Sequence, residues 1–277
     1  MQTLSKQDIC NLIQPRKKSS HKGDHGHALL IAGNKGRMGA AVIAARACLR
    51  AGAGLLTIVV PEDERSVLQI AIPEAMLAMQ QTFDYDINKF SAIGMGPAIG
   101  TDEYSVEIFI KIISDCTIPL LIDADALNIL STEKKLFDNI PAGTILTPHP
   151  KEFDRLFGLH KNEDERRTTA INIAKEKDII IVLKGHKTLI TSGGKSFINT
   201  TGNAGLAKGG SGDALTGIIT SFMAQGYERF TAAQLGVYIH GIAADITLNR
   251  QSSESMLITD VIDSMGEAFK TLLNDSV

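Results

Sequence analysis

A Gly-rich stretch followed by an apolar helix carries the strongest chemical signal in the sequence. Residues 203–217 read Asn-Ala-Gly-Leu-Ala-Lys-Gly-Gly-Ser-Gly-Asp-Ala-Leu-Thr-Gly, and apolar residues recur at helical spacing directly behind the glycines. The first backbone N–H groups of a helix have no partner inside it, and the helix dipole makes this end positive. Gly209, Gly210 and Gly212 would let the backbone approach an anion closely, so the stretch predicts a phosphate-binding loop.

Asp213 stands where a general base for phosphoryl transfer could stand. Beside a bound phosphate, its carboxylate could take the proton from a hydroxyl that attacks that phosphate. The helix dipole also favours a carboxylate in the first turn, so a structural acid without chemistry is the alternative. The loop differs from a Walker A motif because Lys208 precedes the Gly pair, which argues against a P-loop NTPase.

Residues 209–217 resemble the anion-hole and catalytic-Asp signature of ribokinase-like enzymes. With the preceding residues 203–208, the sequence is most similar to the ADP/ATP-dependent NAD(P)H-hydrate dehydratases, which repair hydrated nicotinamide cofactors. The resemblance covers nearly the whole chain. It implies that Asp213 removes the hydroxyl proton, and that the amides around Gly210, Ser211 and Gly212 stabilise the transferred phosphoryl group.

Two further Gly-containing loops follow predicted strands in the first half of the chain. Residues 33–39 carry glycines at G-x-x-G-x-x-G spacing, which does not fit the Rossmann dinucleotide fingerprint. The resemblance assigns Ala40 and Ala41, directly after this loop, to the substrate site, and also Gly96 in the loop 94–100. Packing of small residues against a neighbouring strand is the alternative interpretation.

Carboxylates and one histidine follow two more predicted strands. Asp123 and Asp125 lie two apart, so on a strand they would share a face, and either could help to hold hydrated Mg²⁺ on nucleotide phosphates. A helix cap or strand-end acid is an equal alternative. Two prolines fix the backbone around His149. The resemblance places Asn128 and His149 at the substrate, with Glu152 as a partner through metal-bound water.

A Lys-rich turn after the apolar run 179–183 could place positive charge near phosphates. A solvated turn is the more frequent role of such a segment. The resemblance assigns to the nucleotide site the residues Lys184, Gly185, His186, Lys187, Thr188, Asn203 and Gly212. The segments 188–191 and 196–200 flank a Gly-Gly turn and predict a hairpin beside that site.

Strand patterns alternating with helical patterns predict an α/β three-layer fold with a mostly parallel central sheet. We expect a single ribokinase-like domain over residues 1–277, with 1–20 as an N-terminal helix and connection. The expected strands include 28–32, 55–60 and 90–95. The expected helices include 6–14, 213–225, 231–248 and 258–273. His240 lies on an apolar helix and is interpreted as a core histidine.

Composition and charge indicate which partners and which cellular compartment suit the protein. The 277 residues carry a net charge of −3, which gives no basic surplus for nucleic acid or anionic membranes. The three cysteines are widely spaced and indicate reduced structural residues. No run of about 20 apolar residues appears, and we expect a cytoplasmic protein. Because no lid insertion is apparent, we expect a homo-oligomer, a tetramer in the resembled family, to cover the site.

The resemblance implies a nucleotide-driven dehydration. Hydroxide leaves a damaged nicotinamide ring poorly, whereas phosphorylation of that hydroxyl makes the oxygen part of a departing phosphate. The implied substrates are NADHX or NADPHX with ADP, or ATP, and Mg²⁺, the products are NADH or NADPH with AMP and phosphate, and a separate epimerase would act alongside. A hydroxyethylthiazole-type or hydroxymethylpyrimidine-type kinase and a silent nucleotide sensor are the alternatives; the intact Gly-Ser-Gly-Asp argues against the sensor.

Overall fold

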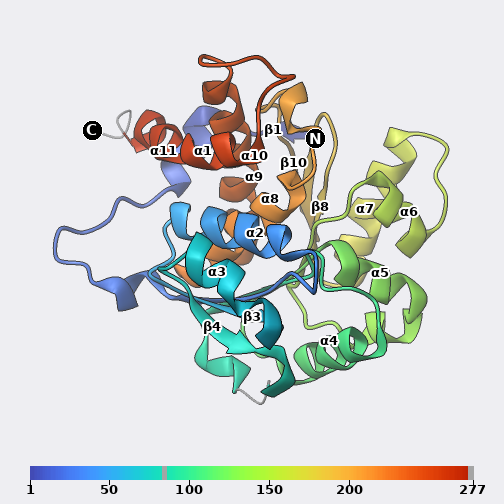
Figure 1. The fold of residues 1–277 in the computed structure, drawn as a ribbon. Coiled ribbons are helices and arrows are strands. Elements are labelled where there is room, and N and C mark those ends of the chain that lie inside the picture. Colours follow the sequence, from blue (N-terminus) through green and yellow to red (C-terminus); the bar gives the residue numbers. More distant parts are fainter. Residues whose placement is uncertain (83–85, 274–277) are drawn as a thin grey trace.

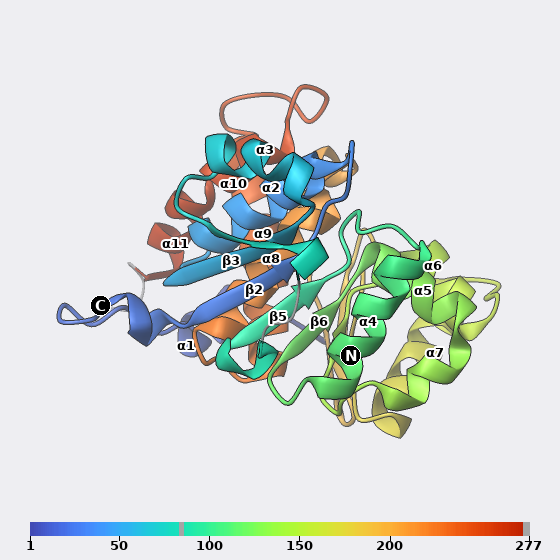
Figure 2. The ribbon, with the colours of Figure 1, turned by 60° about the horizontal axis from the view of Figure 1, so that its bottom comes forward.

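A ten-stranded sheet with helices on both faces forms the framework of the protein (Figures 1 and 2). The computed structural model describes residues 1–82 and 86–273. The strand order is β1-β10-β9-β8-β7-β6-β5-β2-β3-β4. All pairings are parallel except those of β9, which runs antiparallel to both β8 and β10. The predicted three-layer α/β architecture with a mostly parallel sheet is confirmed.

The element bounds follow from the backbone hydrogen bonds. The strands are β1 (Gln2–Thr3), β2 (His27–Ile31), β3 (Leu55–Val60), β4 (Met76–Met79), β5 (Ala92–Met95), β6 (Leu120–Ile122), β7 (Ile145–Leu146), β8 (Ile180–Leu183), β9 (Leu189–Ser192) and β10 (Lys195–Ile198). The α-helices are α1 (Lys6–Leu12), α2 (Met38–Arg50), α3 (Arg65–Ala71), α4 (Glu103–Asp115), α5 (Ala124–Thr132), α6 (Pro150–Phe157), α7 (Glu163–Glu176), α8 (Ser211–Ala224), α9 (Arg229–Thr247), α10 (Ile258–Asp263) and α11 (Met265–Leu273).

Each face of the sheet has its own apolar core. Buried side chains of α2, α8, α9, α10 and α11 pack on one face, and those of α4, α5, α6 and α7 pack on the other. Figure 2 shows these helix groups on opposite sides of the strands. Both faces are covered, so the central strands are apolar throughout, as in β5, where all four residues are buried.

Within the described ranges, no helix has the length and apolar character needed to cross a bilayer.

The sequence predicts the strands and helices named above to within two or three residues. Six elements were not predicted: the strands β1 and β4 and the helices α3, α5, α6 and α7. β1 has two residues, and β4 begins with the exposed Met76. The predicted helix 258–273 is wrong as a single element, because α10 ends at Asp263 and α11 starts at Met265. Ser264 joins them, and its hydroxyl bonds back to Asp260 O at 2.9 Å, a local bond that can bend a helix.

Small residues let α8 lie very close to α2. A Cβ added to Gly217 of α8 would lie 2.0 Å from the backbone oxygen of Ala44 and 3.0 Å from the backbone nitrogen of Cys48. On α2, Ala44, Ala45 and Ala47 are fully buried beside this contact. The Gly217 backbone therefore touches the α2 backbone, and this contact fixes how far the Gly-rich start of α8 extends along the sheet.

We expect Gly217→Ala to lower the free energy of unfolding by about 1–3 kcal/mol, because the methyl group would force the two backbones apart. The matched control is Gly266→Ala on α11, where an added Cβ meets nothing within 4 Å. That substitution should raise stability by roughly 0.5–1 kcal/mol through helix propensity. Urea unfolding of both variants measures the difference, and equal stabilities would contradict the close α2–α8 contact.

Candidate functional site

The ends of β6, β7 and β8 bring three predicted segments together at one edge of the sheet. These strands are parallel neighbours, so their carboxyl ends share that edge, where open α/β sheets bind ligands. Asp123 follows β6, the Thr147–His149 segment follows β7, and Lys184 follows β8. The Gly-rich start of α8 faces them: a Cβ on Gly212 would lie 3.3 Å from Lys184 Nζ and 3.6 Å from Asp123 Oδ2.

Asp123 is a buried anion held by two elements. Its side chain is 1% exposed, Lys184 Nζ donates to Oδ1 at 2.8 Å, and Thr216 Oγ1 donates to Oδ2 at 2.8 Å. Lys184 comes from β8 and Thr216 from α8. A buried carboxylate is tolerated when it is paired and hydrogen-bonded, and both conditions are met here.

The prediction that Asp123 and Asp125 share a strand face is wrong. β6 ends at Ile122, Asp123 occupies the N-cap position of α5, and Asp125 lies in the first turn of that helix. Asp125 Oδ2 accepts a hydrogen bond from Gly100 N at 3.0 Å, in the loop after β5. β6 is therefore too short to include the two aspartates, because α5 begins directly after it.

The first turn of α8 has the features of an anion site. Gly210 occupies the N-cap position in the left-handed region, with φ of 94°, and no side chain caps the helix. Ser211, Gly212 and Asp213 are half-buried. The helix starts two residues before the predicted Asp213, so the Gly-Ser-Gly run lies within its first turn. Uncapped N–H groups at the positive end of a fourteen-residue helix can bind a phosphoryl group.

Asp213 lies close to the Lys184–Asp123 pair, and its surroundings change its acidity. Burial first, and then the negative charge of Asp123, raise the pKa of Asp213 to about 6, against the opposing charge of Lys184. A carboxylate with such a pKa is largely ionised at pH 7 and still accepts a proton readily. Asp213 is therefore suited to general-base chemistry beside the anion site.

His149 and Glu152 form a rigid cap at the start of α6. His149 Nδ1 accepts from the backbone N–H groups of Lys151 and Glu152, at 3.1 and 3.2 Å, and Glu152 Oε2 accepts from His149 N at 2.8 Å. Since Nδ1 accepts, the proton of the neutral ring is assigned to Nε2, which lies 3.3 Å from Glu152 Oε1. Burial lowers the pKa of His149, against the opposing charge of Glu152.

Glu152 connects this cap to the centre of the site. Its side chain is 7% exposed, and Oε2 lies 3.9 Å from Lys184 Nζ. Lys184 therefore faces Asp123 directly and Glu152 at longer range. The predicted residues His149, Glu152, Lys184, Asp123 and Asp213 thus form one cluster of charged and polar groups.

Gly96 supports Asp123 through a backbone contact that excludes a side chain. Its φ is +135°, and an added Cβ would lie 1.8 Å from Asp123 O. Two non-glycine residues nearby also have positive φ, Ala98 at 54° and Ala124 at 48°. Strained backbone of this kind often occurs at functional sites, where the surroundings hold it in place.

The predicted substrate residues Ala40, Ala41 and Asn128 lie outside this cluster. Ala41 is fully buried, and an added Cβ on Gly33 would lie 2.9 Å from its methyl group, so Ala41 packs against the strand end. Ala40 is half-buried in the first turn of α2. Asn128 Nδ2 donates to Asp125 Oδ1 at 3.2 Å, and Arg155 donates to Asn128 Oδ1 at 2.8 Å.

The predicted nucleotide segment leads outward from Lys184. Gly185, His186 and Lys187 are exposed, and Thr188 Oγ1 donates to Gly185 O at 3.2 Å. A cavity of about 190 Å³ adjoins the segment. It is lined by Pro150, Glu163, Arg166, Arg167, Leu183 and residues 184–187. Arg166 is paired with Asp154 at 2.8 Å and Arg167 with Glu163, and the sequence alone did not connect these arginines with the segment.

Asn203 orients the loop that leads to α8. Its Nδ2 donates to Asp245 Oδ1 at 3.0 Å, and its Oδ1 accepts from Gly205 N at 2.9 Å. Asp245 also accepts from Gly202 N at 2.9 Å. Asp245 is on α9, so α9 anchors the loop from outside the cluster.

Sequence reasoning missed Thr216, Arg155 and Asp245 as parts of this network. Thr216 lies three residues after Asp213, so helical spacing places both on one face of α8, and this signal was available. Arg155 and Asp245 reach their partners across 27 and 42 residues of sequence. Nothing in the local pattern predicts those two contacts.

The described residues do not form a protein cage for Mg²⁺. Among residues 1–82 and 86–273, no group of three His, Cys, Asp or Glu side chains is arranged to hold a metal ion. Both oxygens of Asp123 already accept hydrogen bonds. Mg²⁺ is often bound mainly by phosphates and water with one or two carboxylates, and only that arrangement fits here.

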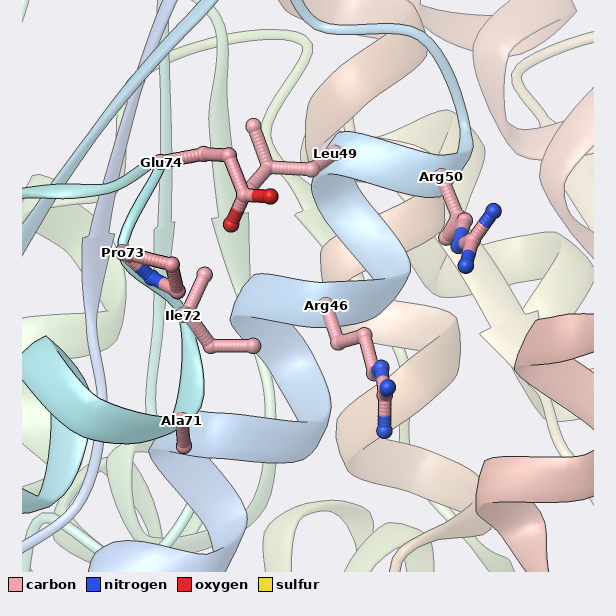
Figure 3. Close-up of a pocket in the computed structure, with 7 residues that line it drawn as sticks. All are labelled: Arg46, Leu49, Arg50, Ala71, Ile72, Pro73 and Glu74. Carbon is pink, nitrogen blue, oxygen red and sulfur yellow. The ribbon is translucent and has the colours of Figure 1, made fainter.

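A larger cavity lies away from this cluster. It has a volume of about 390 Å³ (Figure 3). It is lined by the last turns of α2, by Ala71 at the end of α3 and by residues 72–74, which lead to β4. Arg46 and Arg50 lie on α2, and their guanidinium groups lie 4.0 and 3.7 Å from Asp263 Oδ1. α2 begins near the carboxyl end of β2 and ends at the opposite edge of the sheet, so this cavity contains none of the predicted site residues.

Comparisons with known proteins identify the family of this chain. The sequence profile of the NAD(P)H-hydrate dehydratase family matches residues 28–266. The ADP-dependent (S)-NAD(P)H-hydrate dehydratase of Neisseria meningitidis is 39% identical over 246 residues, covering 85% of this chain and 82% of the relative. The bifunctional NAD(P)H-hydrate repair enzyme of Moorella thermoacetica is 34% identical over 280 residues, and the chain spans about half of its length, 53%.

Solved structures show the same fold. The Bacillus subtilis ADP/ATP-dependent NAD(P)H-hydrate dehydratase, co-crystallised with ATP and Mg²⁺, superposes with a TM-score of 0.86 at 30% identity, covering 98% of both chains. A ribokinase-like superfamily protein from Enterococcus faecalis gives a TM-score of 0.87 at 28% identity, covering 98% of this chain and 96% of that one. The sequence matches and the shared fold show that this chain belongs to the NAD(P)H-hydrate dehydratase family, with a ribokinase-like fold.

Proposed function

We propose that the protein is an ADP-dependent (S)-NAD(P)H-hydrate dehydratase, which uses a nucleotide to convert NADHX or NADPHX back to NADH or NADPH. The observation that carries this proposal is the uncapped Gly-rich start of α8 with Asp213 in the same turn, facing Lys184. This arrangement provides an anion site, a base and a cation at one strand edge. The relatives named above support the substrate.

Asp213, Lys184 and the start of α8 each have a defined task in the proposed reaction. Asp213 accepts the proton of the ring hydroxyl while that oxygen attacks the terminal phosphoryl group of the donor. The first N–H groups of α8 stabilise charge on the transferred group. Lys184 neutralises phosphate charge at the end of β8. Phosphate then leaves with the former hydroxyl oxygen and a ring proton is lost, so the net change is removal of water and cleavage of ADP to AMP and phosphate.

Nucleotide binding is proposed for Lys184, Gly185, His186, Lys187, Thr188, Asn203 and Gly212. Substrate binding is proposed for Ala40, Gly96, Asn128, His149 and Asp213, with Ala41 contributing through packing. Mg²⁺ would supply charge neutralisation on the donor's phosphates. Asp123 and Glu152 would contribute to that ion through water at most.

We expect the purified protein to regenerate reduced cofactor from hydrated NADPH in the presence of ADP and Mg²⁺. AMP and phosphate should appear in amounts equal to the NADPH recovered. The measurement follows the absorbance of the dihydronicotinamide ring, with parallel reactions that contain ATP or lack nucleotide. Accumulation of a stable phosphorylated product, with no recovered absorbance, would indicate an ordinary small-molecule kinase instead.

We expect Asp213→Asn to lower kcat by about 10²–10⁴-fold, because the amide cannot accept the hydroxyl proton. For the unmodified protein, kcat/KM should rise with pH through about 6, following ionisation of Asp213, whose pKa burial raises to about 6. The control is Asp263→Asn, which changes an exposed carboxylate next to Arg46 and Arg50 and should leave kcat unchanged. Full turnover by Asp213→Asn would eliminate the base assignment.

The raised pKa of Asp213 also predicts a pH-dependent effect on stability. The folded pKa, about 6, lies above the ordinary value of 3.8 for an aspartate, so ionising this group costs folding free energy as the pH rises from about 4 to above 6. Asp213→Asn removes this cost and should be more stable than the wild type at pH 8 by on the order of 2 kcal/mol. At pH 4 the difference should largely vanish. Urea unfolding at both pH values measures this, and a pH-independent difference would contradict it.

The proposal extends to the assembly and its setting. We propose that the enzyme works in the cytoplasm as a homo-oligomer, a tetramer, whose neighbouring subunit covers the site, and that a separate NAD(P)HX epimerase acts alongside it. The bifunctional NAD(P)H-hydrate repair enzyme of Moorella thermoacetica, a relative about twice as long, supports such a pairing of two repair activities. Gel filtration should give the elution volume of a tetramer, and elution as a monomer at working concentration would exclude this cover.

A further inference from the structure

Two buried polar atoms near the cluster lack hydrogen-bond partners. They are Thr147 Oγ1, on a residue that is 0% exposed, and His240 Nε2, on a residue that is 6% exposed. Among the buried side-chain atoms of residues 1–82 and 86–273, these two are the ones without a protein partner. An unpaired buried polar group is costly, so native proteins supply such groups with a partner, frequently an ordered water molecule.

Thr147 follows β7, between the strand ends that carry Asp123 and Lys184. Thr147 N donates to Ile122 O of β6, and Pro148 O accepts from Lys184 N after β8, so Thr147 lies between the two strand ends that the ion pair joins. Ile145 packs in the core beside α8 and α9, whereas Leu146 packs in the core on the opposite face. Because side chains alternate along a strand, the Thr147 hydroxyl projects toward α8 and α9.

His240 approaches the same place from α9. Gly236, one turn earlier, packs against Ile219 of α8, where an added Cβ would lie 2.4 Å from Ile219 Cγ1. The short connection between α8 and α9 reverses the chain, so His240 lies about one turn nearer to the start of α8, at the level of Thr216. Burial, together with the charge of Lys184, lowers the pKa of His240 to about 4, so the ring is neutral at pH 7 and lies within electrostatic reach of Lys184.

We propose that Thr147 Oγ1 and His240 Nε2 together bind one buried water molecule beneath the Lys184–Asp123 pair, and that Thr147 and His240 are positioning residues for the Lys184 ammonium. A buried water usually makes about three hydrogen bonds. A hydroxyl and a neutral ring nitrogen supply two, and the ion pair above supplies the third. The closed network then restricts the ammonium to one orientation.

The proposed link to Lys184 rests on the proposed role of Lys184 in nucleotide binding. Lys184 already donates to Asp123, and its remaining N–H groups are the ones available to phosphate oxygens. Losing the water would let the ammonium rotate. The loss should therefore weaken nucleotide binding more than it slows the chemical step.

The kinetic test uses Thr147→Val, which removes the hydroxyl at nearly constant shape, His240→Leu, and the double variant. Each single variant should raise the KM for ADP by about fivefold, the effect of one hydrogen bond of roughly 1 kcal/mol, with kcat within about twofold of the wild type. The KM for ADP of the double variant should not exceed the higher KM of the two single variants, because both substitutions remove the same water. The control Thr247→Val removes another buried hydroxyl, one bonded to Ala243 O at 2.8 Å, and should leave the KM unchanged.

A high-resolution crystal structure of the nucleotide-free protein tests the water independently of activity. We expect a water bonded to Thr147 Oγ1 and His240 Nε2, and its disappearance in Thr147→Val, which decides the point even where His240→Leu fails to fold. Absence of that water, multiplied effects in the double variant, or an unchanged KM in Thr147→Val would each overturn the inference. If the water is present and neither ADP nor ATP supports dehydration, the proposed function fails, whereas the water site stands.

Discussion

The buried carboxylate of Asp123 is the constraint on which the site depends. Removing a carboxylate from water is expensive, and the protein compensates with a cation and a hydroxyl donor, each at 2.8 Å. These partners come from Lys184, 61 residues away, and Thr216, 93 residues away. The folded state therefore satisfies Asp123 only when β6, β8 and α8 are docked correctly. The same contacts bring the base and the anion site together.

One cation serves several carboxylates at this edge of the sheet, and this sharing sets the chemistry. Lys184 bonds to Asp123, lies 3.9 Å from Glu152, and acts on Asp213 through its charge. Lys184 bonds directly to Asp123, whereas burial and the charge of Asp123 raise the pKa of Asp213 against the charge of Lys184. Two neighbouring acids with different surroundings thus take different roles, one structural and one suited to proton transfer.

The sequence predicts features that depend on local pattern and cannot predict those that depend on tertiary contact. The glycines of α8, the prolines around His149 and the apolar strand runs each have local signatures, and the structure has the corresponding elements. The helix that starts at Ala124 was missed because its left-handed φ of 48° has no local signature, and the contacts that surround it are tertiary: Gly96 lies against the Asp123 backbone, and Asp125 N donates to Gly96 O at 3.2 Å. The unpaired His240 Nε2 could not be predicted either, because an apolar helix pattern predicts burial of the side chain but not its hydrogen-bond partners.

The packing of α8 on α2 places the anion site from a distance. Gly217 contacts the Ala44 backbone, and Gly212 lies five residues earlier, about 7.5 Å along the helix axis. A helix transmits such a displacement nearly rigidly, so any side chain at 217 would also move the N–H groups that face Lys184. Small residues on α2 and α8 consequently have two effects, since the packing that stabilises the fold also sets the distance between base, cation and phosphate. A site held on rigid elements in this way needs no movement of its own to be assembled.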